Sequence, residues 1–304
     1  RRRRVAAGLP SADPLPLSQG DGPVFIVGAP RSGTSILYRT LLKHPSFLVE
    51  GPEELALAES GVLDSLDSAP RWRPPRPRRL WLFFLGDEAA YSAFCEEVRQ
   101  SARGVGVPKD GQAPPWAGAV LEAFVRHAAA VRRCRRLLEK TPTHIERADW
   151  LLDALPSSRL LFIHRHPVDT YTSYLRRAAV DPDASWAKLT VDEFGEIYRR
   201  QGNAAQRLVR EVPERFLTIA YEEFTSKPTA VTAAICDFLG EPFVRDIVDE
   251  PNPDLGRARF DPHLYGRITR RTKDSAEFVD EATAQAVMER TGDVAAHWGY
   301  SGWA

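Results

Sequence analysis

The feature that most restricts the fold lies near the start of the chain. It is a short apolar run followed by a glycine loop and then by a helical stretch. Residues 24–27 (VFIV) lie between turn residues and predict a buried strand. Residues 28–33 (GAPRSG) form the loop, and 34–42 have a helical pattern. Such a loop presents backbone N–H groups and the positive end of the helix dipole to an anion. The sequence therefore predicts a phosphate-binding strand–loop–helix unit.

Two further apolar runs, at 159–163 and 216–219, repeat the strand pattern. We expect helices at 53–66, 80–100, 116–138, 148–155, 168–177, 194–211 and 231–239. Continuous apolar strands that alternate with helices are typical of a parallel sheet with both faces covered. The predicted fold class is therefore α/β, a parallel sheet flanked by helices. We expect a flexible tail at 1–22 and a single domain at 23–304, with a helical insertion at about 54–135.

Charge and composition exclude several classes of function. The 304 residues carry 41 basic and 41 acidic side chains, so no net charge attracts nucleic acid. No apolar run approaches the 18 residues that indicate a membrane span, and we expect no integral membrane segment. Three cysteines cannot form a disulfide framework, which favours a reducing compartment and a cytoplasmic protein. They are Cys95, Cys134 and Cys236. The sequence does not indicate an oligomeric state.

The glycine loop differs from that of the nucleotide triphosphatases at one decisive position. In their pattern, G-x-x-x-x-G-K-[ST], the Lys reaches the β- and γ-phosphates and the next hydroxyl holds Mg²⁺. Here Thr34 stands in place of that Lys, and the basic residue is Arg31 inside the loop. The loop can grip a phosphate, but it is poorly equipped for chemistry on a metal-bound triphosphate.

Residues 28–35 (GAPRSGTS) resemble the 5′-phosphosulfate loop of sulfotransferases that use 3′-phosphoadenosine-5′-phosphosulfate (PAPS). The resemblance implies a P-loop-like sulfotransferase fold, with PAPS as donor and 3′-phosphoadenosine-5′-phosphate (PAP) as product. It also implies that the loop and the helix start bind the cofactor. The residues concerned are Arg31, Ser32, Gly33, Thr34 and Ser35.

Two later segments resemble other parts of the same family. Arg165 ends the second apolar run, and Ser173 follows it by eight residues, as in the family's 3′-phosphate motif. Arg165 at the carboxyl end of a strand can contact a phosphate through its planar fork. Tyr221 after the third run matches a family Tyr near the adenine. Arg270 and Arg271 lie where the family closes a loop over the 3′-phosphate.

Residues 139–144 (EKTPTH) supply the catalytic candidates. Lys140 matches the family Lys that contacts the sulfuryl group, and Glu139 matches the Glu used as base in the branch with heparan N-sulfotransferases. His144 is a second candidate base, since an unperturbed His has a suitable pKa. Glu53, or its neighbour Glu54, is a third, because the tyrosylprotein branch uses a Glu shortly after the first helix. We favour Glu139 and leave the other candidates open.

The predicted reaction is in-line transfer of a sulfuryl group to a hydroxyl. The protein aligns the groups and offsets charge on the leaving oxygen. No metal is expected, because Arg31, Arg165 and backbone N–H groups meet the phosphates of the donor, and no closely spaced set of His, Cys and acidic residues suggests a metal site. We expect the acceptor to be a small molecule, a lipid or a saccharide, held by the insertion and aromatic residues such as Trp116. The alternatives are a P-loop kinase and a binding module without catalysis.

Overall fold

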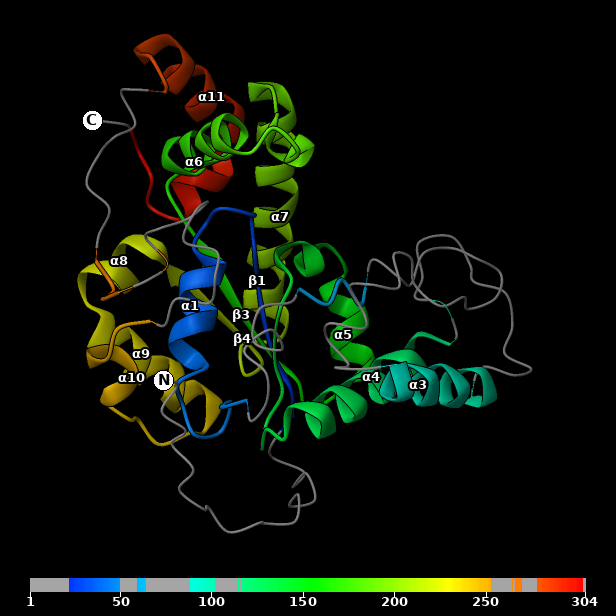
Figure 1. Cartoon of the computed structure of the whole chain (residues 1–304). Helices are drawn as coiled ribbons and strands as arrows, with labels where there is room; N and C mark the ends of the chain where they lie inside the picture. Colours follow the sequence, from blue (N-terminus) through cyan, green and yellow to red (C-terminus); the bar gives the residue numbers. More distant parts are fainter. Residues whose placement is uncertain are drawn as a thin grey trace, which may run out of the picture.

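Four parallel strands form the centre of the protein, in the order β2-β1-β3-β4 (Figure 1). The computed structural model describes residues 22–49, 59–63, 88–101, 114, 116–252, 264, 266–269 and 278–302. The strands are β1 (Val24–Gly28), β2 (Leu138–Lys140), β3 (Arg159–His164) and β4 (Phe216–Ala220). Because β1 pairs with both β2 and β3, the segments that follow these strands meet at one edge of the sheet.

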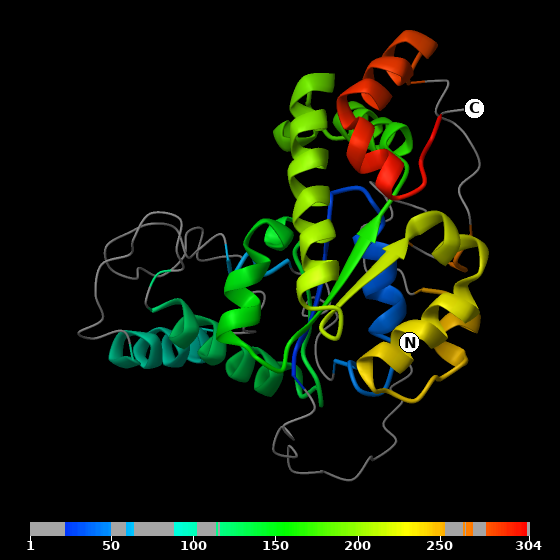
Figure 2. The ribbon, with the colours of Figure 1, turned by 180° about the vertical axis from the view of Figure 1, so that it is seen from behind.

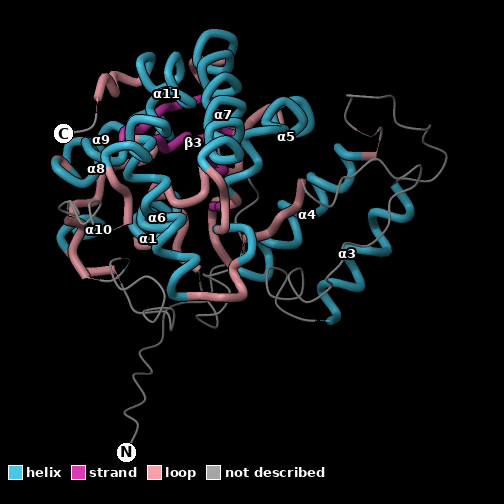
Figure 3. The backbone as a smooth tube through the Cα atoms, turned by 90° about the horizontal axis from the view of Figure 1, so that it is seen from above, coloured by secondary structure: helices cyan, strands magenta, loops and turns pink. Residues whose placement is uncertain are grey.

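Each face of the sheet is covered by helices, as the fully apolar strands require. Phe25 and Val27 of β1 pack on one face and Val24 and Ile26 on the other. The first face carries α3 (Glu88–Ser101), α4 (Ala117–Arg132), α5 (Ala148–Ala154) and part of α7 (Val191–Glu211). The second carries α1 (Thr34–Leu41), α8 (Tyr221–Ser226), α9 (Pro228–Leu239) and α10 (Asp246–Asp249). Helices α3 and α4 lie side by side and extend away from the sheet (Figure 3).

A third core lies beyond the carboxyl ends of the strands. It joins α6 (Pro167–Val180), the short 3₁₀ helix η4 (Ser185–Ala187), α7 and α11 (Glu281–His297) (Figure 2). Two glycines of α7 let α11 approach closely. A Cβ at Gly202 would lie 2.2 Å from Val294 Cγ1, and one at Gly195 would lie 2.7 Å from Arg290 Cβ. Helix α11 is thereby held against α7, and the chain after it reaches the end of β3.

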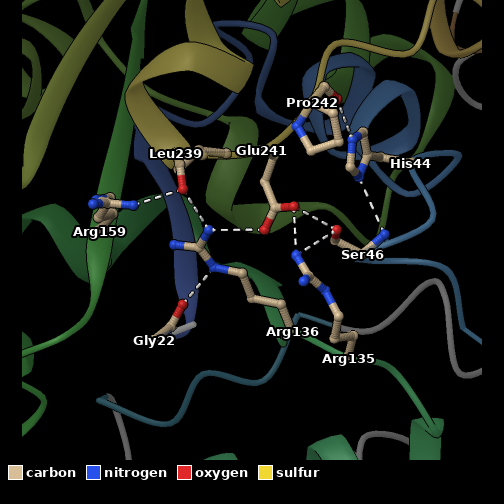
Figure 4. Close-up of polar contacts among 9 residues, drawn as sticks. All are labelled: Gly22, His44, Ser46, Arg135, Arg136, Arg159, Leu239, Glu241 and Pro242. Carbon is tan, nitrogen blue, oxygen red and sulfur yellow. Dashed lines mark hydrogen bonds and ion pairs between the residues drawn. The ribbon is translucent and has the colours of Figure 1, made fainter. Parts of the chain in front are cut away.

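A buried cluster of charges closes the opposite, amino-terminal end of the sheet (Figure 4). Arg136 donates to the carbonyl oxygens of Gly22 and Leu239 and forms an ion pair with Glu241 at 3.2 Å. Glu241 also accepts from Ser46 and from Arg135. The cluster joins the start of β1, the end of α9 and the segment before β2, so it fixes elements that are distant in sequence.

Most of the predicted elements are confirmed within one to three residues. One prediction is wrong at its end, because the helix expected at 116–138 stops at Arg132. Arg133 adopts a left-handed φ of 49° there, which turns the chain into β2. Residues 59–63, the described part of the helix expected at 53–66, are not helical. The 3₁₀ helix η3 (Pro142–Arg147) follows β2. The tail at 1–21 lies outside the described residues.

Candidate active site

The loop between β1 and α1 is held against β3 by its own side chains. Ser32 Oγ donates to the carbonyl oxygen of Ile163 at 2.9 Å. Arg31 has a φ of 72°, a costly conformation for a residue with a side chain and one that clusters at functional sites. Gly33 has a φ of 111° and caps α1, and a Cβ there would lie 2.5 Å from Tyr221 Cδ2. Glycine offers no capping side chain, so the amides at the start of α1 are available to an anion.

One hydrogen bond joins the two phosphate motifs that the sequence predicts separately. Arg31 Nε donates to Ser173 Oγ at 3.1 Å, although the two residues are 142 positions apart. Ser173 lies on α6, which begins directly after the Arg165 loop. The first loop and the second motif therefore form one surface at the carboxyl ends of β1 and β3.

Arg165 lies at the centre of this surface and is only 9% exposed. Its guanidinium lies over the Tyr221 ring, 4.4 Å from the centroid. Its backbone oxygen accepts from Tyr198 Oη at 3.0 Å. Its Nε is buried without a hydrogen-bond partner, and no carboxylate in the described part of the chain forms an ion pair with it. A buried cation in this state is costly unless a ligand supplies the anion.

The segment 139–144 brings two of the candidate bases into contact. Glu139 Oε1 accepts from Ser60 Oγ at 2.6 Å and from Thr141 Oγ1 at 2.5 Å, and Oε2 lies 3.3 Å from His144 Nδ1. His144 Nε2 accepts the backbone N–H of Leu63 at 3.3 Å. A neutral His144 with that acceptor carries its proton on Nδ1, facing Glu139. Both side chains are fully buried.

The surroundings of Glu139 alter its pKa in opposite directions. Burial raises the pKa of Glu139, but the adjacent His144 ring and the hydrogen bonds from Ser60 and Thr141 outweigh burial and lower the pKa to about 2. A carboxylate with so low a pKa is a weak proton acceptor near neutral pH. In this arrangement Glu139 is held as an anion beside His144.

Lys140 is separated from Glu139 by the geometry of the strand. Both residues lie in β2 (Leu138–Lys140), which pairs with β1 as a parallel strand. Successive side chains of a strand point to opposite faces, so the two groups face different sides of the sheet. Lys140 is buried and forms an ion pair with the half-exposed Glu59. The ammonium group thus already has an anionic partner at its tip.

A model of the sulfotransferase family matches residues 23–245. The chain belongs to the sulfotransferase family. The matched range contains the glycine loop, the 139–144 segment, Arg165, Ser173 and Tyr221. No curated protein was found to be similar in sequence.

Solved sulfotransferase structures share the fold of this sulfotransferase. The sulfotransferase domain of the curacin biosynthetic pathway is 17% identical, with a TM-score of 0.54 over 92% of this chain and 98% of that one. The sulfotransferase domain of the Synechococcus PCC 7002 olefin synthase is 20% identical, with a TM-score of 0.52 over 94% and 98%. These similarities confirm the parallel sheet flanked by helices.

The predicted cofactor residues that the structure describes lie close together. Arg31, Ser32 and Gly33 form the loop, while Thr34 and Ser35 begin α1. Arg165, Ser173 and Tyr221 complete the same surface. Glu53, Glu54, Arg270 and Arg271 lie outside the described residues, as do most of the aromatic residues expected at the acceptor site. Trp116 is buried in the core with α3 and α4, so it packs the fold.

Several residues around Arg165 escaped prediction. His164, Glu222 and Tyr300 form a hydrogen-bonded chain beside it, and Trp298 stacks on His164. The only sequence signal for Glu222 was its place directly after Tyr221. In the described ranges, no group of three or more His, Cys, Asp or Glu side chains has the arrangement of a metal site. No described helix is both long and apolar enough to cross a membrane.

Proposed function

We propose that this sulfotransferase moves a sulfuryl group from PAPS to a hydroxyl of a small-molecule, lipid or saccharide acceptor in the cytoplasm. The observation that carries the proposal is the contact of Arg31 with Ser173 at 3.1 Å. It joins a loop suited to the 5′-phosphate to a helix suited to the 3′-phosphate, so one ligand with two separate phosphates spans both. A nucleoside 3′,5′-bisphosphate has that form.

Different groups of the described residues bind different parts of the cofactor. The amides of the loop and of the first turn of α1 bind the 5′-phosphosulfate, aided by Arg31. Arg165 and Ser173 bind the 3′-phosphate, which gives Arg165 an anion that no carboxylate of the described residues supplies. Tyr221 lies beneath the Arg165 guanidinium and contacts the adenine.

The chemical step forms one bond and breaks another. The acceptor oxygen attacks sulfur, the bond from sulfur to the 5′-phosphate oxygen breaks, and PAP leaves with the electron pair. Lys140 stabilises the charge that develops on that oxygen, after exchanging its partner Glu59 for the cofactor. The acceptor proton passes to a protein base, and the step requires no metal.

The base is supplied by the pair of Glu139 and His144. Residues 60–63 cover both groups in the free protein, because Ser60 contacts Glu139 and the Leu63 amide contacts His144. This segment belongs to the expected acceptor-side insertion, so acceptor binding must displace it before a hydroxyl reaches the pair. Glu53 remains a third candidate base.

A ligand panel followed by an activity assay tests the proposal. PAP should raise the melting temperature without metal, whereas ATP with Mg²⁺ should not. Incubation with PAPS and a panel of hydroxyl compounds should then give products heavier by one sulfuryl group, with EDTA present. Turnover that needs Mg²⁺ would instead support a kinase, and PAP binding without product from any acceptor class would support a binding module.

A further inference from the structure

The chain after α11 crosses the carboxyl end of β3 and makes a chain of hydrogen bonds there. Tyr300 Oη donates to Glu222 Oε2 at 2.8 Å and lies 2.9 Å from His164 Nδ1. A carboxylate can only accept, so the hydroxyl proton points to Glu222 and His164 Nδ1–H donates to Tyr300. Burial and the nearby His297 lower the pKa of His164 to about 4, which leaves its ring neutral at physiological pH. The direction of the whole chain of bonds is thereby defined.

Glu222 extends this chain to the loop that carries Arg165. Its second oxygen, Oε1, accepts the backbone N–H of His166 at 2.9 Å. The residues before and after Arg165 are therefore both tied to the same network, His164 through Tyr300 and His166 through Glu222. Tyr221, on which the Arg165 guanidinium lies, directly precedes Glu222. Arg165 and Tyr221, which stack on each other, are thus each next in sequence to a residue of the hydrogen-bonded network.

The segment that delivers Tyr300 is itself firmly packed. The Trp298 ring stacks on His164, with 4.5 Å between centroids and 25° between planes. Helix α11 lies against α7 at the two glycines described above, and α7 also supplies Tyr198, which bonds the Arg165 carbonyl. The network is consequently fixed to α7 and α11, and these helices can hold Arg165 in place.

We propose that Tyr300 is a positioning residue for recognition of the 3′-phosphate. Its hydroxyl contacts Glu222 and His164, and through them it acts on the orientation of Arg165 and Tyr221. Among the described residues no side chain accepts from Arg165 Nε, so the direction of the guanidinium depends on the Arg165 backbone and on Tyr221. The inference rests on the proposed function, because it concerns the residues assigned there to the nucleotide.

The variant Tyr300→Phe removes the hydroxyl and keeps the ring. We expect its affinity for PAP to fall about tenfold, the effect of one hydrogen bond to a charged group, while its affinity for adenosine 5′-phosphate changes less than threefold. The matched control is Tyr171→Phe, which removes a buried hydroxyl that donates to the Leu189 carbonyl at 3.1 Å. The control should keep the wild-type preference for PAP. A merely structural loss would lower the melting temperature without changing the ratio of the two affinities.

The outcomes separate this inference from the function on which it rests. Wild-type protein that binds both nucleotides equally refutes the proposed function and the inference with it. Wild-type protein that prefers PAP, with a preference unchanged in Tyr300→Phe, overturns the inference alone. If Tyr300→Phe does not fold, Glu222→Gln replaces it. Its amide keeps one acceptor for His166 but cannot accept from Tyr300 as well, so the same loss of preference is expected and a retained preference overturns the inference.

Discussion

Two buried arginines at opposite ends of the sheet differ in the groups that surround their guanidinium groups. Arg136, at the amino-terminal end, is fully buried and contacts two carbonyl oxygens and the Glu241 carboxylate (Figure 4). Arg165, at the carboxyl end, is nearly as buried but lies on an aromatic ring, and no described carboxylate pairs with it. The two guanidinium groups are thus similarly buried, but only that of Arg136 is paired with a described carboxylate.

This difference in partners indicates different roles for Arg136 and Arg165. A buried guanidinium whose partners are all protein groups joins parts of the fold, and removing it leaves a carboxylate partly uncompensated. A buried guanidinium without a carboxylate lowers the stability of the free protein and gains an anion only when a ligand binds. Arg136 should therefore matter for folding and Arg165 for binding.

The largest expected effect is on stability, at the Arg136 end. Arg136→Met should lower the free energy of unfolding by about 3 kcal/mol or more, because it breaks a buried ion pair and removes the Arg136 hydrogen bonds to the carbonyls of Gly22 and Leu239, of which Leu239 keeps Arg159 as a donor. Urea denaturation measures the loss, and the folded variant should bind PAP within twofold of wild type. Arg135→Met is the matched control. Its side chain is 44% exposed on the same carboxylate, so it should cost less than about 1 kcal/mol. Equal losses in the two variants would contradict this assignment.

Glu139→Gln tests whether the Glu139–His144 pair supplies the catalytic base. If the pair supplies the base, Glu139→Gln lowers kcat by roughly 10²–10⁴-fold and leaves PAP affinity nearly unchanged. His144→Asn in parallel ranks the two groups, and the larger loss of kcat identifies the one that takes the proton. Unchanged kcat in both variants would remove the pair from the mechanism and favour Glu53 or Glu54.

The low pKa of Glu139 also predicts a dependence of stability on pH. A carboxyl whose pKa falls on folding, here from 4.5 to about 2, stabilises the protein above its unfolded pKa. That contribution is lost as pH falls from about 5 toward 2. Acid denaturation followed by circular dichroism should show a shallower loss of stability in Glu139→Gln than in wild type. Identical acid limbs would show that the carboxylate is not stabilised in the fold.

Arg165→Ala is the counterpart of Arg136→Met. We expect it to weaken PAP binding by about 10- to 100-fold through loss of a charge-assisted contact. The free energy of unfolding should change by less than about 1 kcal/mol, because no ion pair to a described carboxylate is broken. Calorimetry and urea denaturation on the same preparation measure the two quantities. A stability loss as large as that of Arg136→Met would erase the distinction between the two ends.

Ser173→Ala should have the smallest effect. The variant loses one hydroxyl contact to the ligand and the hydrogen bond that orients Arg31, which together predict about a 5- to 20-fold weaker binding of PAP. Thr172→Ala, one residue earlier on α6, removes a hydroxyl that bonds only to its own helix at the Val168 carbonyl, and it serves as control. Equal weakening in the two variants would point to a general disturbance of α6.

Much of the candidate cofactor site could be predicted from sequence because its residues follow the ends of strands. Arg31 and Arg165 each lie in the loop that follows an apolar run, and parallel strands bring such loops to one edge. The contact between Arg31 and Ser173 follows from that topology once the strand order is known. What local pattern could not show was the strand order itself, with β1 between β2 and β3.

Other features were not predictable for physical reasons. Strand β2 has three residues and no apolar alternation, so it reads as the end of the preceding helix. The burial of Glu139 depends on Ser60, which lies 79 residues away. Tyr300 acquires its place only because α11 packs on the glycines of α7, and no periodicity in the segment 298–302 indicates a partner 78 residues upstream. Long-range contacts of single polar groups leave no local pattern.

Recognition of a 3′-phosphate by Arg165 is tested most directly by one calorimetric cycle. Wild type and Arg165→Ala are each titrated with PAP and with adenosine 5′-phosphate, which differ only in that phosphate. We expect wild type to prefer PAP by at least tenfold and the variant to lose most of this preference, with little change in its affinity for adenosine 5′-phosphate. An equal loss of affinity for both nucleotides would contradict this expectation.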